Sequence, residues 1–107
     1  VGSQAAALHP DGTVDMRGIP LGALARLCGR ARLNFGPSTG TLHFAAFCQA
    51  PVATWNGDAY KFDAMVARYK RDWNPFGAPA FVMDHPTWSP QAAEVLAFVK
   101  EVLSSAE

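Results

Sequence analysis

The residues of this chain best suited to binding chemistry lie in one short segment, Gly36 to Gly40, which reads GPSTG and follows a short apolar run. Ser38 or Thr39 can cap a helix that begins there, and the free N–H groups of a first helical turn attract an anion. His43 comes four residues after Thr39 in an otherwise apolar stretch, where its ring could donate to a phosphate oxygen. The segment therefore predicts a phosphate site. The alternative is an ordinary helix cap with His43 packed in the core.

Other phosphate and metal motifs do not fit the sequence. No Lys follows the second glycine of GPSTG, so the segment is not a P-loop, and it does not match G-x-G-x-x-G. The histidines and cysteines lack the spacing of a zinc site, and no carboxylate pair flanks the loop. The net charge is zero, which argues against nucleic-acid binding. We therefore expect neither a metal nor a cofactor.

Alternating helix and strand patterns must position the GPSTG segment. Apolar side chains at helical spacing predict helices over residues 21–29, 39–49 and from 89 to the end, the last with Ser89 as its N-cap. Short apolar runs predict strands at 13–16, 31–35, 51–55 and 78–83. Residues 58–77 are interpreted as a long loop with one or two helical turns. The alternation predicts one α/β domain over residues 1–107, with a Rossmann-like parallel sheet in three layers.

In such sheets, ligands bind beyond the carboxyl ends of the strands, and the GPSTG segment lies at that edge. Trp55 and Asn56 end the next predicted strand at the same edge, where a base or sugar could stack. A core tryptophan followed by a turn is the alternative. Arg17 begins a stretch without acidic residues that continues with Arg26, Arg30 and Arg32. These arginines form either a cationic rim beside the phosphate or an exposed helix face.

A longer pattern of residues extends over positions 13–57. Its members are Asp15, Arg17-Gly18, Leu21, Leu24-Ala25, Ala31, Gly36, Ser38-Thr39-Gly40, His43, Ala45-Ala46 and Pro51. This pattern resembles the carboxyl-terminal half of heptosyltransferase-like glycosyltransferases, which have the two-domain GT-B architecture. In that family this half binds the diphosphate of a nucleotide-sugar without a metal. The resemblance implies that Ser38, Thr39, Gly40 and His43 contact the diphosphate, although the family usually has Asp at the position of Ser38.

The resemblance also implies a function, the transfer of a sugar to a glycan or lipid-linked acceptor. On this interpretation the amino-terminal acceptor domain and the catalytic base lie outside the sequence. The donor domain is then truncated at its N-terminus, and the isolated chain is inactive. The alternative is a nonenzymatic α/β interaction or scaffold module that kept the fold and lost the chemistry. An exposed sheet edge would permit self-association, and Phe98, off the apolar stripe of the last helix, would face a partner.

The expected location is the cytoplasm. Cys28 and Cys48 lack a C-x-x-C arrangement and are interpreted as reduced thiols within apolar helical patterns. The sequence shows no signal-peptide pattern. Its apolar stretches are far shorter than the roughly 20 residues that span a bilayer. We therefore expect no stable insertion into a membrane.

Overall fold

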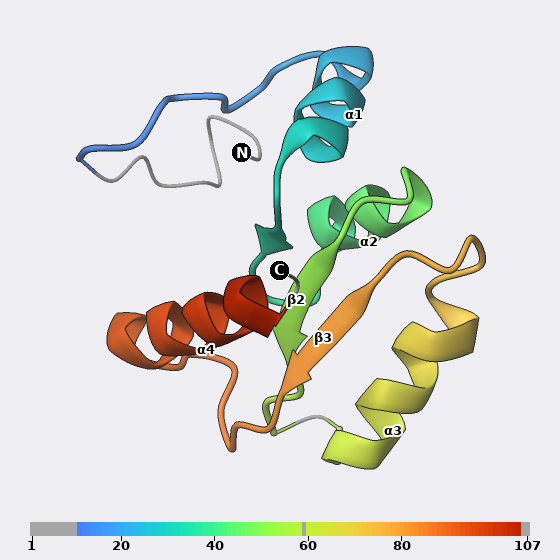
Figure 1. The fold of residues 1–107 in the computed structure, drawn as a ribbon, viewed down its shortest axis with the longest axis vertical. Coiled ribbons are helices and arrows are strands. Elements are labelled where there is room, and N and C mark those ends of the chain that lie inside the picture. The colour runs from blue at the N-terminus through green and yellow to red at the C-terminus, as the bar shows by residue number, and fades with distance from the viewer. Residues whose placement is uncertain (1–10, 59, 106–107) are drawn as a thin grey trace.

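The computed structural model describes residues 11–58 and 60–105, which contain a parallel sheet of three strands in the order β1-β2-β3. The strands are β1 (Asn34–Phe35), β2 (Val52–Trp55) and β3 (Ala80–Met83). Asn34 pairs with Val52, which pairs with Ala80 on its other side. Because all three strands run in the same direction, their carboxyl ends lie at one edge of the sheet (Figure 1). The predicted parallel α/β arrangement is confirmed at this level.

Helices alternate with the strands along the chain. Helix α1 (Leu21–Arg30) precedes β1, α2 (Gly40–Phe47) connects β1 to β2, and α4 (Ala92–Ser105) follows β3. Between β2 and β3, α3 (Phe62–Ala67) continues directly into a short π-helical segment, η1 (Arg68–Asp72). Helices α3 and α4 lie on opposite sides of β3 (Figure 1). No helix in the described part of the chain is both long and apolar enough to cross a membrane.

The main core lies where α2 and the α3–η1 helix pack over one face of β2. All four residues of β2 are buried. Helix α2 has apolar side chains around most of its circumference, and Leu42, Ala45 and Ala46 are buried in this core. Met65 and Tyr69, one helical turn apart, are only 0% and 1% exposed. The core therefore fixes both the start of α2 and the side chains of η1 that lie near it.

Two predictions of secondary structure are wrong. Residues 13–16 form no strand, and Val14 is 76% exposed because none of the described strands lies beside it. Residues 58–77 are not mainly a loop, because most of this stretch forms α3 and η1. Its apolar residues fall at helical spacing once Met65 and Tyr69 are taken as one stripe.

Helix boundaries also differ from the prediction at the start of α4. The helix begins at Ala92 rather than directly after Ser89. The Gln91 N–H donates to the Glu94 carboxylate at 2.7 Å, and the Glu94 N–H donates to the Gln91 carbonyl at 3.0 Å. This is the geometry of a helix start, with Glu94 acting as it does in a capping box. The Gln91 N–H and the Glu94 carboxylate therefore satisfy each other at this terminus.

Candidate functional site

The loop from β1 to α2 lies at the carboxyl edge of the sheet, as predicted. Thr39 has extended backbone angles at the N-cap position, but its side chain makes no capping hydrogen bond. The first backbone hydrogen bond of the helix runs from the His43 N–H to the Thr39 carbonyl at 3.0 Å. The N–H groups of Gly40, Thr41 and Leu42 therefore have no acceptor within the helix. A Cβ atom added at Gly40 would meet no atom within 4 Å from outside the adjacent residues and the nearby helix backbone, so the space beside Gly40 is open.

Ser38 does not cap α2 either, because its hydroxyl turns toward the core. Its Oγ lies 2.7 Å from the Tyr69 hydroxyl and 3.3 Å from Nε2 of His43. Tyr69 is almost fully buried and belongs to η1. Burial raises the pKa of its phenol, while the hydrogen bond to Ser38 opposes that shift. The Ser38–Tyr69 hydrogen bond thus joins the β1–α2 loop to the helix that follows β2.

His43 is held among aromatic rings. Its imidazole stacks on Tyr69, with ring centroids 5.8 Å apart, and meets the ring of Trp73 edge-on at 5.1 Å. Burial lowers the pKa of His43 because desolvation disfavours the charged imidazolium. The ring is therefore largely neutral near pH 7. Its Nε2 is directed at Ser38 rather than at the open space before α2.

A cation and one further ring, that of Tyr60, extend this cluster. Trp73 packs edge-on against Tyr69 and Tyr60, with centroid distances of 5.5 Å and 5.7 Å. The Arg68 guanidinium lies 5.3 Å from the centroid of Trp73 and 5.6 Å from that of Tyr60. Such cation–π contacts hold a positive charge near the rings. Sequence reasoning missed the role of Tyr69, although its helical spacing from Met65 was the available signal.

The side chains of Trp55 and Asn56 are buried and hydrogen-bonded within the protein, so neither is available to contact a ligand at the edge of the sheet. Trp55 is 6% exposed, and its Nε1–H donates to the Trp88 carbonyl at 2.9 Å. Asn56 is 4% exposed; its amide donates to the Tyr60 carbonyl and accepts from the His85 N–H. Asn56 therefore ties together the loops that follow β2 and β3. This arrangement agrees with the alternative interpretation of the sequence, a core tryptophan followed by a turn.

The arginine stretch does not form a single rim. The Arg17 guanidinium pairs with Asp15, with Nε 2.9 Å from the carboxylate. Arg26 and Arg30 line a separate groove of about 420 Å³, together with Met16 and Leu27. Arg30 also stands in the last turn of α1, where a cation is favoured by the helix dipole.

A serine beside a histidine in a G-x-S-x-G segment also suggests acyl transfer, in which the serine is a nucleophile on a strained turn. The backbone of Ser38 is not strained in this way, because Gln49 is the one described non-glycine residue with positive φ. No carboxylate is hydrogen-bonded to His43 in the described structure, so nothing of that kind orients the imidazole as a base. The arrangement therefore favours binding over nucleophilic catalysis. The described residues also include no group of side chains that could hold a metal.

Comparisons with protein-family models, with curated proteins and with solved structures found no match. Function is therefore inferred from the residues and from the geometry of the site. The feature that distinguishes this edge is the start of α2, where N–H groups without an acceptor in the helix lie next to an open position at Gly40, one turn from the aromatic cluster around His43.

Proposed function

We propose that this chain is the donor-binding part of a metal-independent glycosyltransferase that holds the diphosphate of a nucleotide-sugar at the start of α2. The observation that carries the proposal is the uncapped first turn of α2, which begins at Gly40 at the carboxyl edge of the sheet. Free N–H groups and the positive end of a helix dipole favour a phosphate there. The resemblance of residues 13–57 to the GT-B family supports the same position for the ligand.

On this proposal, the described strands are part of a larger Rossmann-like sheet in three layers, and a separate amino-terminal domain supplies the acceptor site and the catalytic base. Thr39 and Gly40 would contact the diphosphate directly, since both are exposed beside the open space. Ser38 and His43 would hold the loop, because their hydrogen bond points inward. The two free cysteines, Cys28 and Cys48, are consistent with the cytoplasm as the proposed location.

The test is a titration of the isotope-labelled chain with UDP, ADP, GDP and inorganic pyrophosphate, followed by amide chemical shifts in the presence of EDTA. We expect shifts concentrated in residues 36–43 and a Kd on the order of millimolar, about −4 kcal/mol, because the other domain contributes no contacts. Affinity should rise as the pH falls, because a bound phosphate favours the charged imidazolium. Since burial lowers the pKa of His43, this gain comes at more acidic pH than for a free histidine.

A pair of glycine variants separates loss of binding from loss of folding. Gly40→Val places a branched side chain in the open space before α2, and Gly22→Val makes the same change near the start of α1. A Cβ atom at either position would meet nothing within 4 Å, so both variants should fold. We expect Gly40→Val alone to abolish the shifts. Equal binding by both variants, or binding only with magnesium, would contradict the proposal and favour a nonenzymatic interaction module.

A further inference from the structure

The outer edge of β3 carries backbone groups that β2 does not use. The carbonyls of Pro79 and Met83 accept hydrogen bonds from Val52 and Asn56 on the β2 side. Along a strand, successive residues direct their N–H and C=O groups to opposite sides. The N–H and C=O groups of Ala80 and Val82 therefore face away from β2. Since β3 ends the sheet in the described part of the chain, these groups line a free edge.

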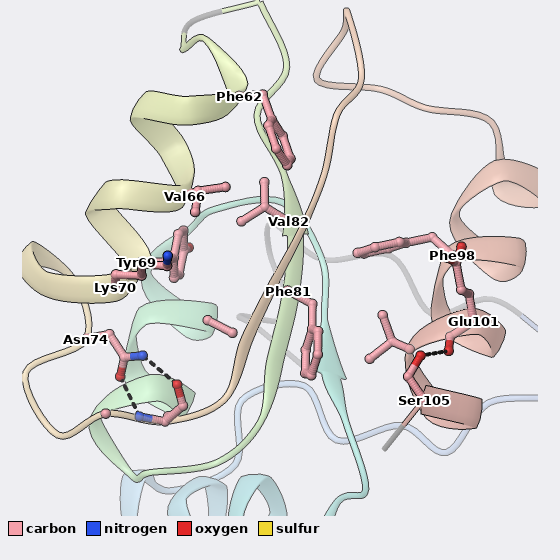
Figure 2. Close-up of a pocket in the computed structure, with 14 residues that line it drawn as sticks. Phe62, Val66, Tyr69, Lys70, Asn74, Phe81, Val82, Phe98, Glu101 and Ser105 are labelled. Atoms are coloured by element: carbon pink, nitrogen blue, oxygen red, sulfur yellow. Dashed lines mark hydrogen bonds between the residues drawn. The ribbon is translucent and has the colours of Figure 1, made fainter. Parts of the chain in front are cut away.

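Just before β3, one side chain pairs with the backbone through the same two groups that a neighbouring strand would use. The Asn74 amide donates to the Ala78 carbonyl at 2.6 Å, and its oxygen accepts from the Ala78 N–H at 2.9 Å (Figure 2). Asn74 is buried, with 5% exposure. The edge thus accepts a two-point amide pairing at Ala78, and its free length begins two residues later at Ala80.

A groove of about 510 Å³ runs along the same edge between α3 and α4. Phe62 and Val66 of α3 form one wall, Phe98 and Val102 of α4 form the other, and Phe81 lies between them in β3 (Figure 2). The edge is therefore flanked by a helix on each side. The same edge of a second copy is flanked by its own two helices, so pairing of two copies would bring four helices to one junction, whereas a single extended segment brings none.

The two walls of the groove carry opposite charges. Lys70 stands on the α3–η1 side and Glu101 on the α4 side (Figure 2). Neither side chain forms an ion pair within the described residues. Successive side chains of an extended segment point to opposite faces, so neighbouring residues of an occupant meet Lys70 and Glu101 separately. The groove therefore suits an extended segment in which an acidic residue lies next to a basic one. Apolar residues of the segment would contact the phenylalanines of the two walls.

We propose that the free edge of β3 binds an extended segment of a partner protein by strand addition, pairing with Ala80 and Val82. In this mode backbone hydrogen bonds supply affinity, and the pockets for alternate side chains supply specificity. The segment carries an acidic residue toward Lys70, a basic residue toward Glu101 and β-branched apolar residues toward Phe62 and Phe98. The groove shares Tyr69 with the cluster behind the start of α2, but the proposed pairing uses the backbone of Ala80 and Val82, so its test does not depend on the diphosphate proposal.

The test uses fluorescent peptides with the sequences TEKVVT and TVVKET, which place the same side chains in parallel and antiparallel orientation. We expect one of them to bind the chain saturably and at least tenfold more tightly than a scrambled peptide. Two further versions carry N-methyl groups on alternate residues, which removes the N–H donors from one side of the strand. One version should lose at least tenfold in affinity and the other should bind normally. Equal binding of both versions would overturn the proposal.

Variants of the protein locate the binding. Val82→Pro removes one N–H from the free edge, where proline is tolerated, and should weaken binding at least tenfold. Val82 also packs against the core, so some loss of melting temperature is expected and binding is compared at a temperature where both proteins are folded. If this variant does not fold, the proposal is tested by exchanging the charges of Lys70 and Glu101. The double variant Lys70→Glu, Glu101→Lys should no longer bind whichever of TEKVVT and TVVKET the parent binds. It should instead bind the version of that peptide in which Glu and Lys have exchanged places. Failure of that exchange, or a dimer in sedimentation that Val82→Pro abolishes, would overturn the proposal.

Discussion

The Ser38–Tyr69 hydrogen bond makes a prediction about stability that depends on which hydroxyl is removed. Ser38→Ala leaves the Tyr69 hydroxyl, on a residue only 1% exposed, without its partner at 2.7 Å. A buried polar group left unsatisfied costs roughly 1–3 kcal/mol. Tyr69→Phe instead leaves the Ser38 hydroxyl, which is half-buried and keeps Nε2 of His43 within 3.3 Å. This variant should cost only about 0.5–1 kcal/mol.

The double variant removes both hydroxyls, so no polar atom of this pair stays buried without a partner. Its free energy of unfolding should lie above that of Ser38→Ala alone, at a cost of about 1 kcal/mol relative to the parent chain. For a domain of this size, 1 kcal/mol corresponds to about 4 °C in melting temperature. The expected decreases are therefore about 8 °C for Ser38→Ala, from the middle of its range, about 2–4 °C for Tyr69→Phe and about 4 °C for the double variant.

The assay is urea unfolding followed by circular dichroism, with thermal melting of the same four proteins as a second measurement. An unchanged m-value is required, so that differences in midpoint report stability rather than compactness. Two results would refute the reasoning. One is additivity of the two substitutions. The other is a larger loss from Tyr69→Phe than from Ser38→Ala, which would mean that the phenol, not the serine, has the alternative partner.

Two further predictions concern a turn and a titrating group. Gly57→Ala should destabilise the chain by more than about 2 kcal/mol, since φ is +62° there and an added Cβ would lie 2.6 Å from the Trp88 ring; the matched change Gly29→Ala, in an open helical position, should stabilise it by about 0.5–1 kcal/mol. The urea midpoint should fall between pH 7 and pH 5 more steeply for the parent than for His43→Gln. Burial lowers the pKa of His43, so the unfolded chain binds its proton first as the pH drops below about 6.5.

The parts of this structure that depend on local sequence could be predicted, and the parts that depend on distant partners could not. The GPSTG segment indicated a turn followed by a helix, and Thr39 does occupy the N-cap position of α2. The contact of Ser38 with Tyr69 joins residues 31 positions apart, and no local spacing encodes it. That contact is also the reason why the expected serine cap is absent. The apolar pattern of residues 39–49 correctly indicated a helix with a buried face, since Leu42, Ala45 and Ala46 are buried. It does not account for the opposite face, where Phe47 is 55% exposed.

The wrong predictions have the same origin. The run at residues 13–16 has a strand-like composition, but a strand also needs a neighbour, and Val14 has none in the described structure. The helix from Phe62 was obscured by the charged residues between its apolar ones. Trp55 looked equally suited to stacking on a ligand and to packing, and its hydrogen bond to Trp88, 33 residues away, was beyond the reach of the sequence pattern.

The parallel order of the sheet has a consequence for how the chain folds. Neighbouring strands of the described sheet cannot form a hairpin, because a helix separates β1 from β2 and another separates β2 from β3. Each strand pairing must therefore wait for a crossover to close, which makes formation of the sheet a slow, non-local step. Strand β2 is hydrogen-bonded on both sides, whereas β1 contributes two residues. Amide protons of β2 should be the last to exchange, and β1 should open well before the chain unfolds as a whole.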